Sequence, residues 1–154
     1  MSLLGGVMVP QQGRLHVLDA DLTALTSSTR DRFRVDHVGL LFQQFNLVPY
    51  LSVRENVLLP CRFSQRRRER ALESADSLEQ SADRLLNQLG LDLTLARQPV
   101  TALSVGQQQR VAAARALMGH PELIIADEPT SALDADRQAE FLDVLLGRCN
   151  DEDV

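Results

Sequence analysis

Two segments in the second half of the chain combine residue types that could bind and cleave a nucleotide. Residues 103–110 place Ser104 and Gly106 in a small-residue turn at the start of an expected helix. The free backbone N–H groups of a helix N-terminus bind phosphate. Residues 123–129 are an apolar run that leads into the carboxylates of Asp127 and Glu128. Paired acids at the carboxyl end of a buried strand can hold Mg²⁺ and prepare a water. Together the two segments indicate part of a nucleotide-hydrolysing site.

The composition is that of a soluble globular domain. The chain has 154 residues, of which 44% are hydrophobic and 24% are charged, so a single domain with a real core is expected. Its net charge of −5 argues against a nucleic-acid partner, because phosphate backbones favour clustered cations. All 16 basic residues are arginines. A chain without lysine cannot contain the phosphate-binding loop G-x-x-x-x-G-K-[ST].

Other sequence features bear on compartment and surface. The one basic run, residues 66–70, is followed at once by acids, which favours a solvated helix face over a membrane-surface role. Cys61 and Cys149 show no metal or redox spacing, which suits a reducing cytoplasm. No apolar run approaches the roughly 20 residues that span a bilayer, and residues 1–7 lack the basic start of a signal peptide. We therefore expect a cytosolic protein unless a membrane partner holds it.

The hydrophobic pattern alternates strands with helices, which predicts an α/β fold. Residues 13–19 alternate as in a half-buried strand, and residues 26–33 suit a short helix. The continuous apolar run 38–42 predicts a strand that is buried on both faces. Residues 53–59 suit a helical turn or two before Pro60.

Helices dominate the second half of the pattern. Apolar residues at steps of three and four predict one long helix over about 67–89, with Gly90 as its C-terminal cap. Ser104 is a good N-cap for a helix that runs through Met118. A short buried strand is expected over 123–126, and Asp134 caps a last helix.

Three motifs occur in the chain in this order: Phe42-Gln43-Gln44, Leu103-Ser104-Val105-Gly106-Gln107, and the apolar strand that ends in Asp127-Glu128. Their common order indicates a protein family much more specifically than any one of them does. In this order they resemble the ATP-binding subunit of an ABC transporter over nearly the whole chain. Within this superfamily, the sequence of residues 39–57 resembles that of the lipoprotein-release and macrolide-export type. The resemblance implies one incomplete ABC ATPase domain over 1–154. Its parts would be a partial P-loop NTPase (RecA-like) core over 1–44 and 104–154, and an inserted helical subdomain over 45–103.

The resemblance also implies roles for individual residues. Gln43 would reach Mg²⁺ and the attacking water, although a glutamine after a strand is more often a surface residue. The segment that begins at Ser104 would bind the γ-phosphate of ATP held by the opposite subunit, through the four residues Ser104, Val105, Gly106 and Gln107. Its plain alternative is an N-capped helix. Val105 stands where the family usually has glycine, which could alter the backbone beside the phosphate.

The acidic residues receive roles in the same way. Asp127 would be a Mg²⁺ ligand, and Glu128 would orient or deprotonate the water. Asp134 would belong to a loop that crosses the dimer interface, besides capping its helix. The resemblance places the phosphate-binding loop just before Met1, and the switch histidine after the last helix. None of His16, His37 and His120 occupies the position of that histidine.

The favoured hypothesis is a fragment of an ATP- and Mg²⁺-dependent ATPase that drives export or lipoprotein release through a membrane permease. It would pair as a homodimer or with a second ATPase subunit, at the inner face of the cell membrane and without nucleic acid. The runner-up is a non-hydrolysing module that docks on a permease or on a full-length subunit. A DNA-repair or chromosome ABC protein is disfavoured, because residues 60–102 hold no coiled-coil insertion and no cysteine pair.

Two expectations concern surfaces. Residues 45–51 are apolar and aromatic around Pro49, so they either contact the permease or fold back onto the long helix. The strands 38–42 and 123–126 should be neighbours, as in related ATPases. The outer edge of the second strand is expected to be unpaired, so the isolated chain should be marginally stable and should self-associate or aggregate through this edge.

Overall fold

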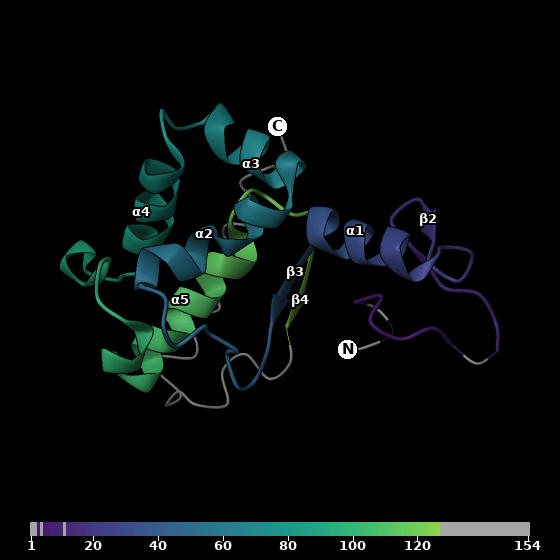
Figure 1. The fold of residues 1–154 in the computed structure, drawn as a ribbon, viewed down its shortest axis with the longest axis horizontal. Coiled ribbons are helices and arrows are strands. Elements are labelled where there is room, and N and C mark those ends of the chain that lie inside the picture. The colour runs from purple at the N-terminus through teal and green to yellow at the C-terminus, as the bar shows by residue number, and fades with distance from the viewer. Residues whose placement is uncertain (1–2, 4, 11, 127–154) are drawn as a thin grey trace.

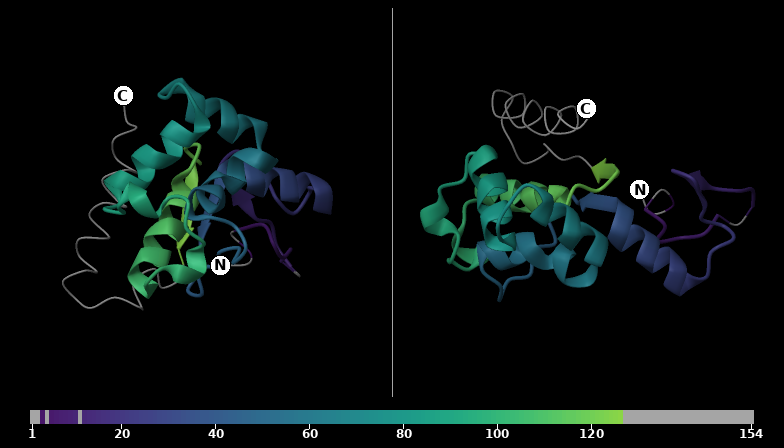
Figure 2. Two further views of the ribbon diagram at one scale, coloured as in Figure 1. Left: turned by 60° about the vertical axis from the view of Figure 1, so that its left-hand side comes forward. Right: turned by 90° about the horizontal axis from the view of Figure 1, so that it is seen from above.

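The computed structural model describes residues 3, 5–10 and 12–126, and within them it forms five α-helices and two small sheets (Figure 1). Helices α2 to α5 pack together beside the strands β3 and β4, whereas α1 and the β1–β2 hairpin extend from the other end of β3 (Figures 1 and 2). The mixture of helices and strands is the predicted α/β class. Asp127, Glu128, Asp134 and the last expected helix lie outside the described residues.

The first expected strand is instead a short hairpin. Strand β1 (His16–Val17) pairs antiparallel with β2 (Ala20–Asp21), in the register His16↔Asp21. The single strand predicted over 13–19 was wrong because Leu18 adopts a left-handed backbone with φ of 52°, which reverses the chain. The hairpin leads to helix α1 (Ser27–His37), whose N-cap is Thr26.

The larger sheet consists of two parallel strands in the described part of the chain. Strands β3 (Val38–Leu41) and β4 (Leu123–Ala126) pair in the register Val38↔Leu123 to Leu41↔Ala126. The prediction that these two apolar strands are neighbours is confirmed. Because they are parallel and in register, their carboxyl ends lie side by side.

Helix α5 (Val105–Leu117) is the centre of the hydrophobic core. It begins after the N-cap Ser104, as predicted, and ends at Leu117, one residue before the predicted end at Met118. Its alanines at 112–114 and 116 are buried, and it packs against both α2 and β3. A Cβ atom at Gly39 would clash with the carbonyl oxygen of Ala116. Small side chains on both elements therefore let the helix lie close to the strand.

Helix α2 (Val53–Phe63) continues through Pro60, so the prediction that helical structure stops before this proline was wrong. Proline removes only its own N–H bond, and the last turn still closes because Ser64 N–H donates to the carbonyl of Pro60 at 2.9 Å. The helix begins with a capping box between Ser52 and Glu55. One apolar face is buried, and packing on that face outweighs the missing bond: Val53, Val57, Leu58 and Cys61.

The long helix predicted over 67–89 is two helices. Helix α3 (Gln65–Glu73) and helix α4 (Leu78–Gln88) are separated by residues 74–77. The side chain of Ser77 accepts a hydrogen bond from Gln80 N–H at 3.1 Å and so starts a new helix. Gly90 follows α4 with φ of 70°, as expected for a C-terminal cap. The 3₁₀ turns η1 (Leu93–Leu95) and η2 (Val100–Ala102) then lead to α5.

The arginine run of α3 is only in part the solvated face that the sequence favoured, because Arg66 and Arg68 are exposed but Arg67 is buried. Arg67 is 3% exposed, and its guanidinium donates to the carbonyls of Met118 at 2.8 Å and Ala116 at 2.6 Å. Burial lowers its pKa to about 10. Arg70 donates to the carbonyl of His120 at 2.6 Å. The run therefore binds the C-terminal end of α5, where unpaired carbonyls favour a cation.

Glu122, just before β4, completes this contact. It pairs with Arg66, with Arg70 at 2.9 Å and with His37 at 3.2 Å. Burial alone would raise the pKa of Glu122, but the hydrogen bond from Arg66 and the charges of Arg70 and His37 outweigh it and lower the pKa. The α5–β4 connection is thus held by α1 and α3 together.

Arg67→Met should lower the free energy of unfolding by about 3 kcal/mol, because two buried carbonyls lose their donors. Arg68→Met, on the exposed neighbour of Arg67, is the control and should change it by no more than about 0.5 kcal/mol. Urea unfolding followed by circular dichroism measures both. Equal effects of the two substitutions would show that the buried contact is not what stabilises α3.

Glu122→Gln should reduce the free energy of unfolding by about 1 kcal/mol at neutral pH. The lowered pKa means that the ionised group stabilises the fold above its ordinary value near 4.5, and that this stabilisation is lost as the pH falls below that value. Urea unfolding at about pH 7 and about pH 3.5 measures the difference in the free energy of unfolding between wild type and Glu122→Gln. This difference should be smaller at the acidic pH. Glu73→Gln, at the exposed end of α3, should give a smaller difference at neutral pH. A pH-independent effect of Glu122→Gln contradicts the ion-pair explanation.

Candidate functional site

The N-terminus of α5 presents the predicted phosphate-binding segment at the surface. Ser104 N–H donates to Oε1 of Gln107 at 2.9 Å, and Gln107 N–H donates to Oγ of Ser104 at 3.3 Å. This reciprocal pair is a capping box, so the plain capping role is present. The Ser104 hydroxyl accepts in this pair and keeps its proton to donate to a ligand. The remaining N–H groups of the first turn have no acceptor within the helix.

Val105, which stands where the resemblance leads one to expect glycine, lies in the first turn of α5. Among the described residues, the non-glycine positions with positive φ are Leu18, Phe45, Asn46 and His120. Val105 therefore needs no left-handed backbone. Its side chain is 55% exposed and adds an apolar group beside the free N–H groups of the helix. Valine in place of glycine at position 105 therefore changes the surface of the segment more than its backbone conformation.

Gln43 is an exposed residue in the turn that follows β3. The register Leu41↔Ala126 puts the start of this turn beside the end of β4. In the sequence, Asp127 and Glu128 come directly after Ala126, but they lie outside the described residues. Among the described residues, no three His, Cys, Asp or Glu side chains gather as a metal site.

The segment 45–51 is partly packed and partly exposed. Phe45 and Leu47 pack against the hydrophobic core, whereas the side chain of Tyr50 is 84% exposed. Packing of part of the segment on the protein itself is therefore observed, although on the common core and not on one long helix; contact of the exposed part with a permease stays a prediction. Arg115 on α5 donates to the carbonyls of Asn46 at 2.6 Å and Phe45 at 2.5 Å.

Asn56 holds the far end of this segment and is a residue that the sequence reasoning missed. It is fully buried; its Oδ1 accepts from Val48 N–H at 2.8 Å. Its amide group donates to the carbonyls of Val48, Leu51 and Ser52 at 3.0–3.3 Å. The signal in the sequence is a single asparagine within the apolar face of α2, because a buried amide needs several partners.

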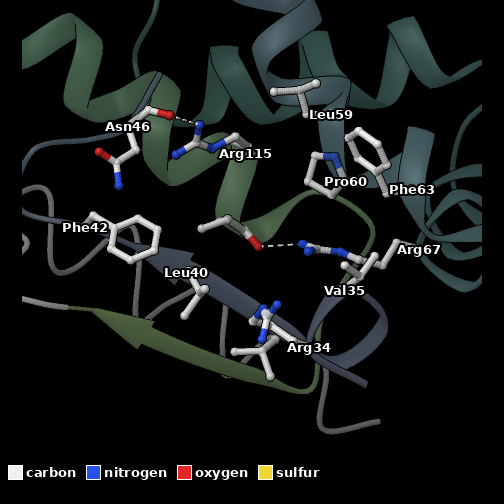
Figure 3. Close-up of a pocket in the computed structure, with 12 residues that line it drawn as sticks. Arg34, Val35, Leu40, Phe42, Asn46, Leu59, Pro60, Phe63, Arg67 and Arg115 are labelled. Atoms are coloured by element: carbon white, nitrogen blue, oxygen red, sulfur yellow. Dashed lines mark hydrogen bonds between the residues drawn. The ribbon is translucent and has the colours of Figure 1, made fainter. Parts of the chain in front are cut away.

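A cavity of about 270 Å³ lies beside this segment, between β3, α2 and α5 (Figure 3). Apolar side chains make up much of its wall: Leu40 and Phe42 beside β3, and Leu59, Pro60 and Phe63 on α2. Arg34 and Arg115 add polar groups to the wall. Phe63 is 66% exposed. The cavity thus opens beside exposed apolar rings, and such apolar surface is typical of an interface.

Cys61 has no reactive character in this environment. Burial raises the pKa of its thiol to about 11, so the thiolate is scarce at neutral pH. Cys149 lies outside the described residues. Within the helices that the structure describes, none is both long and apolar enough to cross a membrane.

Comparison with known proteins identifies the family. A model of the ABC transporter family matches residues 1–131. The macrolide export ATP-binding/permease protein MacB of Rhodopirellula baltica is 39% identical over 99% of this chain and 21% of its own length. The ABC transporter ATP-binding protein YtrE of Bacillus subtilis is 35% identical over 94% of the chain and 59% of its own length. The chain thus spans less than two thirds of these relatives.

Solved structures agree with this match. The dimeric structure of MJ0796, described as a bacterial ABC transporter cassette, has a TM-score of 0.78 at 36% identity and covers 99% of this chain and 63% of its own. The dimeric post-hydrolysis state of the same cassette bound to ADP and Pi has a TM-score of 0.78 at 34% identity. This likeness covers 98% of this chain and 63% of that one. The family match over 1–131 and these two likenesses lead to one conclusion: the chain belongs to the ABC transporter family, with the α/β fold of part of an ATP-binding cassette.

Proposed function

We propose that this chain is part of an ABC ATPase that drives export or lipoprotein release through a membrane permease, at the inner face of the membrane. The observation that carries the proposal is the parallel pairing of β3 with β4, in the register Leu41↔Ala126. It brings the turn that contains Gln43 next to the strand after which Asp127 and Glu128 follow in the sequence. In parallel α/β sheets, ligands bind at this carboxyl edge.

The residues present fit a nucleotide and Mg²⁺. Ser104 keeps a hydroxyl proton to donate, and the N-terminus of α5 offers free N–H groups to a phosphate. We assign the γ-phosphate of ATP on an opposite subunit to Ser104, Val105, Gly106 and Gln107. Carboxylate and amide oxygens suit Mg²⁺, so we assign the ion to Asp127 and Gln43.

In the proposed reaction, Glu128 accepts a proton from the water that attacks the γ-phosphorus, or orients that water, while the bond from the γ-phosphorus to the bridging oxygen breaks and ADP leaves. Gln43 holds the water in line, and the N-terminus of α5 from the opposite subunit stabilises the charge on the γ-phosphoryl group as it passes to the water. Mg²⁺, when bound, neutralises charge on the phosphate oxygens. Asp134 lies in the segment that we assign to the dimer interface. Two copies, or this chain and a second ATPase subunit, would enclose the nucleotides.

A chimera that carries a G-x-x-x-x-G-K-[ST] segment before Met1 tests this proposal. We expect no ATP turnover from the chain alone, because it has no lysine to bind the β- and γ-phosphates. The chimera should turn over ATP, and Glu128→Gln in the chimera should lower turnover by about 100-fold or more while ATP binding remains. Phosphate release and nucleotide binding measure the two effects.

The matched control is Glu79→Gln, on an exposed carboxylate of α4, which should leave turnover unchanged. Loss of ATP binding together with turnover in Glu128→Gln would mean that Glu128 is mainly structural. A chimera that binds a permease but never turns over ATP would favour the second candidate, a non-hydrolysing docking module. The exposed apolar rings of Tyr50 and Phe63, which docking needs and hydrolysis does not, are the observation that favours that candidate.

We also propose that the cavity beside β3 and the segment 45–51 receive the permease. Helices α2 to α4 lie in residues 45–103, the proposed helical subdomain, and the cavity lies between α2 and β3. Its apolar lining and the exposed rings of Tyr50 and Phe63 suit an apolar partner segment.

Tyr50→Asp should weaken binding about tenfold or more to the permease part of the Rhodopirellula baltica macrolide exporter, because it places a charge on an apolar contact. It should leave urea unfolding within about 0.5 kcal/mol of wild type, since the ring is exposed. Leu93→Asp, on an exposed leucine of η1, is the control and should not change binding. Unchanged binding of Tyr50→Asp, measured by pull-down from detergent, would contradict this surface.

A further inference from the structure

The turn after Gln43 is joined to α5 by one side chain. Arg115, in the last turn of α5, donates through its two terminal nitrogens to the carbonyls of Asn46 at 2.6 Å and Phe45 at 2.5 Å. Figure 3 shows the guanidinium of Arg115 facing the Asn46 carbonyl across one end of the cavity. A planar guanidinium can donate to two acceptors at once, which fixes both the distance and the orientation of the turn.

The backbone that Arg115 binds is an unfavourable one. Phe45 and Asn46 have φ of 57° and 48°, and two successive residues with side chains rarely adopt the left-handed region. Within the turn, Phe45 N–H donates to the carbonyl of Phe42 and Asn46 N–H to that of Gln44. Strained backbone persists only where the surrounding structure holds it. The hydrogen bonds from Arg115 are a contact that can hold this turn in its left-handed conformation.

Arg115 has no carboxylate partner among the described residues. It is half-buried, and burial lowers its pKa. A half-buried cation needs hydrogen-bond acceptors to offset its lost hydration, and the printed acceptors are the two carbonyls of the turn. The contact therefore gives the guanidinium its hydrogen-bond acceptors and also stabilises the backbone of the turn.

We propose that Arg115 is a positioning residue that fixes the turn of Gln43 to helix α5. This inference rests on the proposed function, in which Gln43 and Ser104 both serve nucleotide sites. Ser104 caps the other end of α5, roughly 16 Å away at 1.5 Å per residue. Arg115 thereby makes the Gln43 turn and the N-terminus of α5 parts of one rigid unit. A displacement of α5 carries the turn with it.

Amide hydrogen exchange of the chain itself tests this proposal without any nucleotide. In Arg115→Met, the Phe45 and Asn46 amides should exchange about tenfold or more faster than in wild type, because the turn opens locally. Amides in the middle of α2 should keep their rates. Arg115→Lys keeps the charge but not the two-point donor, so its turn should exchange at an intermediate rate.

Arg110→Met is the matched control, because Arg110 lies on the same helix and donates to the carbonyls of Leu89 and Gly90 at 2.9 and 3.1 Å. It should leave the turn at wild-type rates. Wild-type exchange of the turn in Arg115→Met, or faster exchange by the same factor in α2 and the turn, overturns the proposal. If Arg115→Met does not fold, Arg115→Lys decides: about threefold faster exchange confined to the turn supports it, and unchanged exchange overturns it.

A second arm uses the ATP-hydrolysing chimera. Arg115→Lys should lower kcat for ATP by about fivefold with little change in KM, because a misplaced Gln43 affects the reaction and not the binding of ATP. An equal loss in Arg110→Met would mean that α5 tolerates no substitution, which overturns a specific role for Arg115. If the chimera hydrolyses nothing, the proposed function fails, and the exchange experiment still decides whether Arg115 holds the turn.

Discussion

Helix α5 lies so close to strand β3 that only a glycine fits between them. The position is Gly39, where any Cβ would clash with the carbonyl of Ala116 on α5 and with the side chain of Ile124 on β4. The alanines of α5 complete this close packing, since all four at 112–114 and 116 are buried. A larger side chain on either side would push the helix away from the strand and open the core. The remaining elements are arranged around this one contact.

Close packing of α5 against the sheet leaves its ends to be satisfied by other segments. At the C-terminal end, carbonyls that have no intrahelical donor accept from Arg67 of α3, and the connection to β4 is held through Glu122. Gly119 makes this possible, because its φ of 74° brings the chain against the backbone of Arg67. At the N-terminal end, the capping box leaves free N–H groups at the surface. One end of the helix is thus fixed within the fold, and the other is open to a ligand.

The sequence predicted the elements whose patterns are local. The two apolar strands, their adjacency, the Ser104 cap and the Gly90 terminator are all confirmed. It failed at local caps and turns that interrupt a pattern, and where distant contacts decide. Apolar periodicity continued across residues 74–77, but the cap at Ser77 divides the helix there. The roles of Arg67, Asn56 and Arg115 depend on carbonyl acceptors, and every residue type has a carbonyl. For Arg67 and Arg115 those acceptors also lie 49 to 70 positions away, so no motif marks them.

The exclusive use of arginine fits this architecture. Arg67, Arg110 and Arg115 each donate to two backbone carbonyls, at the end of α5, the end of α4 and the turn after Gln43 respectively. A lysine ammonium is a more strongly hydrated point charge without a planar fork, so it would hold such a pair of carbonyls with less precision and at a higher desolvation cost. These three cations are directed at the protein's own backbone and contribute little to an external basic surface. The net charge of −5 agrees with this use of cations inside the fold, because the arginines that hold backbone carbonyls together do not gather as a basic surface.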